Sequence, residues 1–311
     1  MPRLLANART AGVFVLALWL AGCARTPVLL DSTYQSITPQ VELVDVPFVA
    51  QTEYQCGPAS LAMVLGYLGH TPGLDTLIHE VYLPAREGSL QPEMLATARR
   101  HDVIAYPIRP TLDALLHHLE ADEPVVVMQN LALPIYPLWH YAVAVGFDLA
   151  NEQLILRSGD IERHEIAFRR FDATWARSER WGFVVKPPGE LPVDVSKRAA
   201  LDAISAFEAL NGAGAALSSW QALVERYPQS GLAWFALGNA FFDENEPASA
   251  RHAFEAATHA DPELGAAWLN LGLLLANEDD ADAAQQAFAR AAALEGPWQA
   301  RARELLNDQD E

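Results

Sequence analysis

The last third of the chain repeats with a period of 34 residues, and this repeat restricts the possible folds more than any other feature. A shift of 34 residues superimposes six pairs of identical residues: Trp234 on Trp268, Gly238 on Gly272, Ala250 on Ala284, Phe254 on Phe288, Ala257 on Ala291 and Pro228 on Pro262. Small residues are needed where two helices cross closely, large residues fill the space beside them, and proline ends each unit. The sequence therefore predicts stacked helix pairs that bury their apolar faces against one another.

These positions resemble those of tetratricopeptide repeats, which have the same period. A weaker unit precedes the two clear ones, with matching residues at Ala200, Ala216, Trp220 and Pro228. The resemblance implies an all-α repeat domain over residues 196–311, in which Trp298 belongs to a capping helix. The region has 7 basic and 18 acidic residues, so a basic or amide-rich protein partner is one interpretation of its surface. A solvated acidic face without a partner is the alternative.

The N-terminus has the features of an export signal. Arg3 and Arg9 precede an apolar stretch over residues 11–21, which has the length of a signal-peptide core and is too short to span a membrane. The stretch ends in Leu-Ala-Gly-Cys, which resembles the bacterial lipoprotein box, with Cys23 as the lipidated residue. We therefore expect a signal peptide over residues 1–22, a tether over 23–40 and a lipid anchor in a membrane. By resemblance to lipoproteins of bacteria with two membranes, Ala24 after the cysteine implies the outer membrane, facing the periplasm.

Charge and cysteine content exclude several classes of function. The chain has 21 Lys and Arg against 40 Asp and Glu, a net charge of −19, which excludes a non-specific nucleic-acid binder. There are two cysteines, and lipidation of Cys23 would leave Cys56 as the single thiol, so no internal disulfide is expected.

Residues 41–186 combine helices and short β-branched segments. The pattern predicts helices over 56–68, 76–82, 92–100 and 111–120, followed by strands over 125–128, 141–147, 154–157, 166–168 and 182–185. Helices that precede strands in this way indicate an α+β domain. The proline-rich segment 187–195 is the expected linker to the repeats.

The segment Gln51-Thr-Glu-Tyr-Gln-Cys56-Gly-Pro-Ala carries the clearest chemical signal. Proline suits the first turn of a helix, so Cys56 is expected at a helix N-terminus. Free N–H groups and the helix dipole there favour the thiolate, which is the nucleophile in covalent catalysis. The same N–H groups, with the Gln51 amide, would form an oxyanion hole. A buried cysteine that packs as a small apolar residue is the structural alternative.

The general base is expected to be a histidine on a rigid element. His140 directly precedes a predicted strand, in the run His-Tyr-Ala-Val-Ala-Val-Gly-Phe-Asp. His117 and His118 are adjacent on a predicted helix and have no cysteine or carboxylate at ligand spacing, so no metal site is expected there. No cofactor is expected either.

Together the cysteine and histidine motifs, 84 residues apart, resemble papain-like cysteine peptidases that remove double-glycine leaders from bacteriocins, especially the stand-alone members. The resemblance covers roughly residues 43–186 and implies a papain-like fold with Cys56 as nucleophile, His140 as base and Gln51 as oxyanion-hole donor. Gln55 is a rival for the amide role. The family commonly has Asp-Pro after the strand that follows the histidine, and this chain has Ser158-Gly-Asp160 instead. We take Asp160 as the third member of the site, although Ser158 lies nearly at the expected place.

These observations favour an exported, lipid-anchored cysteine peptidase that acts on a peptide or protein, with repeats that recruit a protein partner. Two alternatives use the same residues. In the first, the papain-like domain has lost turnover and acts with the repeats as a binding module. In the second, the nucleophile serves an amidase or transpeptidase, which differs only in what attacks the acyl-enzyme.

Overall fold

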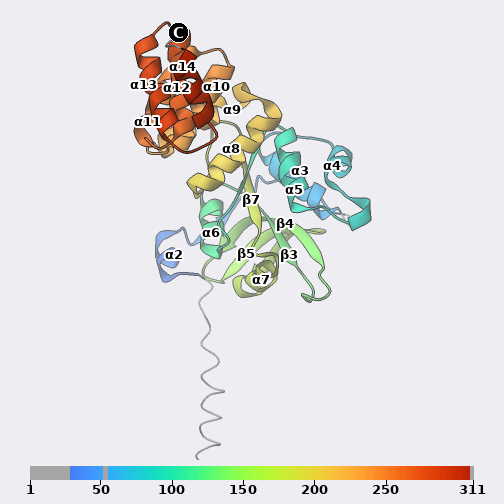
Figure 1. Ribbon diagram of the computed structural model, residues 1–311. Helices are drawn as coiled ribbons and strands as arrows, with labels where there is room; N and C mark the ends of the chain where they lie inside the picture. Colours follow the sequence, from blue (N-terminus) through green and yellow to red (C-terminus); the bar gives the residue numbers. More distant parts are fainter. Residues whose placement is uncertain (1–28, 52–54, 309–311) are drawn as a thin grey trace, which may run out of the picture.

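The computed structural model describes residues 29–51 and 55–308. It contains an α+β part built around one sheet and, after it, a part made of helices alone (Figure 1). This confirms the predicted order of an α+β domain followed by an all-α repeat domain. The predicted signal peptide and the predicted lipidation site at Cys23 lie outside the described residues.

The sheet is antiparallel throughout and positions the strand that carries His140 near its centre. Its strands run in the order β2-β7-β3-β4-β5-β6, and β1 pairs with β4. The strands are β1 (Gln40–Glu42), β2 (Ile104–Pro107), β3 (Val125–Asn130), β4 (Trp139–Asp148), β5 (Gln153–Ser158), β6 (Ile161–Ala167) and β7 (Gly182–Lys186). Every residue of β3 is buried, so helices or loops cover both faces of the sheet there.

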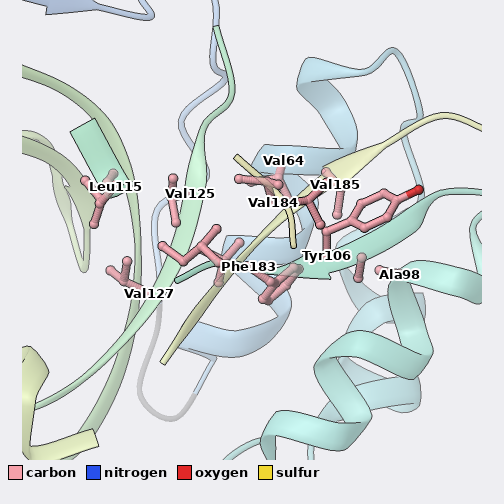
Figure 2. Packing of buried hydrophobic residues seen from close by; sticks show 14 of the residues in the cluster. Val64, Ala98, Tyr106, Leu115, Val125, Val127, Phe183, Val184 and Val185 are labelled. Atoms are coloured by element: carbon pink, nitrogen blue, oxygen red, sulfur yellow. The ribbon is translucent and has the colours of Figure 1, made fainter. Parts of the chain in front are cut away.

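Helices pack on both faces of this sheet. The helices of this part are α2 (Asp31–Ser36), α3 (Cys56–Tyr67), α4 (Leu74–Val81), η1 (Pro84–Arg86), α5 (Gln91–Arg100), α6 (Leu112–Glu120), α7 (Phe168–Trp175) and η2 (Ala176–Ser178). Of these, α3, α5, α6, α7 and η2 contact strands of the sheet. Both α3 and α6 contact β4, and Figure 1 shows them on opposite sides of the strands. Figure 2 shows the core between these layers, where Leu115 of α6 lies near Val125 and Val127 of β3.

The predicted helices and strands of this domain are present, with shifted ends. The four predicted helices correspond to α3, α4, α5 and α6. The predicted strand over 166–168 is wrong in its extent, because β6 is longer and α7 begins at Phe168. The elements α2, β1, β2 and α7 were not predicted from the sequence.

The expected tether over residues 23–40 is wrong from Leu29 onward, because this segment is part of the folded domain. The side chains of Leu29 and Thr33 are buried. The backbone N–H of Leu30 and the hydroxyl of Thr33 both donate hydrogen bonds to the carboxylate of Asp113 on α6. The hydroxyl of Thr38 donates to Glu120 at 2.7 Å. These polar contacts explain why the segment has little apolar periodicity and yet is ordered.

The repeat region consists of the helices α8 (Lys197–Asn211), α9 (Ala213–Arg226), α10 (Gly231–Asp243), α11 (Pro247–Ala260), α12 (Gly265–Asn277), α13 (Ala281–Ala293) and α14 (Gln299–Asp308). The same contacts recur one period apart. A side chain at Gly238 would collide with the ring of Phe254, and one at Gly272 with the ring of Phe288. The indoles of Trp234 and Trp268 donate to the carbonyls of Pro228 and Pro262, both at 2.9 Å. These contacts are the physical reason for the 34-residue period.

The expected linker is packed tightly between the two parts. The N–H of Val193 and the ammonium of Lys186 both bind the buried carboxylate of Glu123, which is also 2.6 Å from Nδ1 of His118. On the repeat side, the carbonyls of Leu191, Pro192 and Val195 accept hydrogen bonds from Arg226 and Tyr227. One cluster of buried apolar residues runs from the sheet domain into the first repeat helices. Within residues 29–51 and 55–308, no helix is both long and apolar enough to cross a membrane.

Candidate active site

Cys56 is the first residue of α3. Its neighbour Gly57 is needed because any side chain there would collide with Ser89. Pro58 lies in the first turn, where its missing N–H breaks no helix hydrogen bond. The local sequence therefore places a thiol at the free N–H groups of a buried helix end, as the motif predicted.

Burial dominates the electrostatics of the thiol and raises the pKa of Cys56. Three backbone N–H groups oppose this effect by facing the sulfur, those of Tyr141, Gly57 and Cys56 itself. The expected lowering of the pKa by the helix N-terminus is therefore outweighed, and the resting side chain is a neutral thiol. The N–H of Tyr141 also shows that the start of α3 meets β4 directly beside His140.

The imidazole of His140 is held from the neighbouring strand. Its Nε2 lies 2.9 Å from Oγ of Ser158, the last residue of β5. Burial, helped by the electrostatic effect of the nearby His164 on β6, lowers the pKa of His140 to about 4. The ring is therefore neutral at neutral pH and has the form of a base that can accept a proton. Among the described residues no hydrogen bond joins His140 to Cys56.

The structure does not bring Asp160 to His140. Ser158 pairs with Ile161 across a two-residue turn, and Asp160 is exposed in that turn. Gly159 has φ of 65°, as the first position of such a tight hairpin requires. The choice of Asp160 over Ser158 as the partner of His140 is therefore corrected by the geometry, because the chain has already turned away from the site at Asp160.

Gln51 is placed beside the same turn. Its backbone N–H donates to the carbonyl of Gly159 at 3.1 Å. Its side-chain Nε2 is buried and has no hydrogen-bond partner among the described residues. A buried amide donor without a partner costs free energy unless a ligand oxygen accepts from it, which fits the predicted oxyanion-hole role. Gln55 is the N-cap residue of α3, and its side chain makes no capping hydrogen bond.

A pocket of about 470 Å³ is lined by neighbours of the site residues rather than by Cys56, His140 or Gln51 themselves. Its wall includes Trp139, which directly precedes His140, and Trp181, whose ring packs edge-on against Tyr141 with centroids 5.9 Å apart. Met128 and Arg177 also line it. The roles of Trp181 and His164 were not predicted from the sequence, because both depend on which strands are neighbours in the sheet. The two apolar segments on either side of Gly159 were a signal for a hairpin, and that hairpin would have placed His164 on the strand next to β5.

Comparison with known proteins agrees with this geometry. Residues 43–181 match the model of the Peptidase_C39 like family, and residues 201–251 and 235–301 match the tetratricopeptide repeat. No curated protein matches the chain.

Solved structures resemble each part separately. A putative C39-like peptidase from Bacillus anthracis is 20% identical, with a TM-score of 0.42 over 48% of this chain and 98% of that chain. A double glycine motif protease from an AMS/PCAT transporter, in complex with a leader peptide, is 23% identical, with a TM-score of 0.36 over 47% of this chain and 94% of that chain. MamA is 22% identical, with a TM-score of 0.33 over 36% of this chain. The present chain spans 64% of the length of MamA.

The family models cover the two parts that the sequence and the fold distinguish. The predicted resemblance to each family is therefore confirmed over the residues that these models match. The chain joins a Peptidase_C39-like domain to a module of tetratricopeptide repeats.

Proposed function

We propose that the chain is an exported, lipid-anchored cysteine peptidase in which Cys56 is the nucleophile and His140 the base. One observation carries this proposal: the backbone N–H of Tyr141 faces the sulfur of Cys56 at the start of α3, so the sulfur lies beside the strand that holds His140. Ser158 fixes the imidazole from its other side. The peptidase-like fold supports the proposal at a coarser level.

The chemistry follows from the neutral resting forms of the two side chains. His140 takes the proton of the Cys56 thiol as the sulfur attacks the peptide carbonyl, and the carbonyl oxygen becomes an oxyanion. The Gln51 amide and the N–H groups at the start of α3 donate hydrogen bonds to that oxygen. His140 then gives its proton to the leaving amine. Water attacks the resulting thioester with His140 again as base, which releases the acid and restores the thiol.

The remaining parts of the proposal concern location and recruitment. A lipid on Cys23 would hold the chain at the outer membrane, facing the periplasm. The repeats would bind a peptide or protein and bring it to the peptidase domain, as stacked helical repeats commonly do. Labelling with a palmitate analogue in wild-type cells and in cells with Cys23→Ala tests the anchor. Incorporation that persists in the variant would exclude Cys23 as the lipidated residue.

A second candidate is a peptide-binding module without turnover. Ser158 favours it, because a hydroxyl in place of a carboxylate gives no charge to stabilise the imidazolium. Both candidates predict peptide binding, and only the first predicts an acyl-enzyme.

The test is incubation of a peptide library with the chain from Ala24 onward, with Cys56→Ala and His140→Ala as controls. Mass spectrometry of the products and of the protein detects cleaved peptides and the thioester. We expect cleavage in the wild type and none in Cys56→Ala. Products joined to an added amine would identify a transpeptidase instead, and bound but intact peptides would identify the binding module.

A further inference from the structure

Residues 131–139, the loop between β3 and β4 together with the first residue of β4, form an exposed apolar surface. Its exposed large side chains are Leu131, Leu133, Ile135, Tyr136, Leu138 and Trp139. Ile135 and Tyr136 at the tip are 78% and 77% exposed. The segment contains no charged residue, in a chain whose net charge is −19. A contiguous apolar patch of this kind marks an interaction site, unlike single exposed apolar residues.

The loop is an ordered hairpin that satisfies most of its own backbone. The N–H of Leu131 donates to the carbonyl of Leu138 at 2.9 Å, and that of Tyr136 to the carbonyl of Leu133 at 3.1 Å. Oδ1 of Asn130 accepts from two further backbone N–H groups at 3.0 Å each. Two prolines within the loop remove two more donors. A backbone with few free donors can enter an apolar medium at little cost in lost hydrogen bonds.

Arginines lie next to this hairpin. Arg177 of η2 donates hydrogen bonds to the carbonyls of Asn130 and Ala132 at its base. Arg169 and Arg170 are exposed on α7, which contacts β3 and lies near the hairpin in Figure 1. Within the described part of the chain, these three guanidinium groups form no ion pair with a carboxylate. Guanidinium groups at a surface bind phosphate groups well, and Arg169 and Arg170 are the two that are not already hydrogen-bonded to the hairpin.

The start of the folded domain lies at the same end of the molecule. Figure 1 shows α2, α7 and the hairpin at the end away from the repeats. Only five residues lie between Cys23 and the buried Leu29, so a lipid on Cys23 would hold this end within about 20 Å of its bilayer, the length of six extended residue steps. Leu30 and Tyr34 add exposed apolar side chains beside α2.

We propose that this end of the domain docks on a phospholipid bilayer, with the tip of the hairpin inserted among the headgroups and the arginines against lipid phosphates. Tyrosine and tryptophan are suited to that depth, because their rings are apolar and their polar atoms reach water. The proposal rests on the proposed lipid anchor for proximity to a bilayer, but not on peptidase activity.

The test uses the chain from Ala24 onward, which contains every described residue and lacks the lipidation site. Its sedimentation is measured with vesicles of phosphatidylethanolamine and phosphatidylglycerol, and with vesicles of phosphatidylcholine alone. We expect the wild type to bind the vesicles, and we expect the double change Ile135→Ser and Tyr136→Ser to weaken this binding at least about tenfold. The matched control is Leu232→Ser with Phe242→Ser, two residues on α10 that are 52% and 51% exposed and whose change leaves binding intact. Arg169→Gln with Arg170→Gln weakens binding to both kinds of vesicle, and more strongly to the anionic one.

Other occupants of the hairpin would give different results. Absence of wild-type binding, or equal binding by the tip variant, would overturn the proposal. Equal vesicle binding together with a raised KM for peptide cleavage in the tip variant would identify a substrate-binding rim. If the wild type forms a dimer and the tip variant is a monomer, the hairpin contacts a second copy of the chain instead. Cys56→Ala binds vesicles as the wild type does, so failure of the peptidase proposal is distinguishable from failure of this one.

Discussion

Ser158 provides the sharpest test of the site. In the described part of the chain its hydroxyl is the hydrogen-bond partner of the His140 ring, at 2.9 Å. A hydroxyl fixes the orientation of the ring but carries no charge that would stabilise the imidazolium. Ser158→Ala removes the hydrogen bond, and Ser158→Asp places a carboxylate at the same position.

The geometry sets the size of each effect. A hydrogen bond between neutral, partly buried groups contributes about 1 kcal/mol, so Ser158→Ala is expected to lower kcat/KM about fivefold. A carboxylate makes a charge-assisted bond roughly twice as strong, which favours the protonated ring. Ser158→Asp is therefore expected to raise the pKa of His140 from about 4 toward its ordinary value of 6.5.

Two measurements follow these changes. NMR titration of histidine-labelled protein gives the pKa of His140, with His140→Ala to assign its signal, and cleavage of a peptide found in the library gives kcat/KM. Asp160→Ala is the matched control, because Asp160 is exposed in the turn and is expected to leave both values unchanged. A greater loss of kcat/KM in Asp160→Ala than in Ser158→Ala would refute the reasoning, as would a pKa that stays near 4 in Ser158→Asp.

Three further predictions concern titration and packing. The folded protein holds His140 neutral down to about pH 4, whereas the same residue in the unfolded chain is protonated below about pH 6.5, so the free energy of unfolding falls as the pH falls between these values. The variant His140→Gln has no group that titrates there and is expected to keep about 3 kcal/mol that the wild type loses by pH 4. Urea unfolding of both proteins across this pH range measures the difference, and parallel pH dependences would contradict it. Since burial raises the pKa of Cys56, its alkylation by iodoacetamide is expected to be slow at neutral pH and to accelerate only at a higher pH than that of a free thiol, whose pKa is about 8.5. A rate already constant at neutral pH would show a preformed thiolate. Gly272→Ala places a methyl group within 3 Å of the Phe288 ring and is expected to lower the stability of the repeats by about 1 to 3 kcal/mol in thermal unfolding. Gly73→Ala is the control, because the nearest atom to a methyl group there is 3.7 Å away. Equal melting temperatures for the two variants would show that Phe288 moves aside freely.

The sequence predicted the repeat helices well because their packing is local. Gly238 and Phe254 contact each other and lie only one helix apart in the chain, so a short period reveals the contact. The helix that begins at Cys56 was equally accessible, because its glycine and proline have local reasons to be there.

The partner of His140 depended on long-range pairing instead. The register between β4 and β5 shifts at a bulge between Ala144 and Gly146, and the end of β5 lies beside His140 only through that register. Counting residues after the histidine therefore favoured Asp160, which the turn carries away from the site. The segment after Leu29 was misjudged for a similar reason, since its order comes from Asp113 and Glu120 on α6 rather than from its own apolar pattern.

The packed connection between the two parts has a geometric consequence for substrates. The apolar core continues from the sheet into the first repeat helices, and the intervening strand of chain is hydrogen-bonded on both sides. The repeats therefore cannot swing toward or away from Cys56 without breaking buried contacts. A ligand held by the repeats would reach the thiol of Cys56 only if its chain spans the fixed distance between the repeats and the thiol. The peptide bond that reacts would then be set by its distance along the ligand from the segment that the repeats bind.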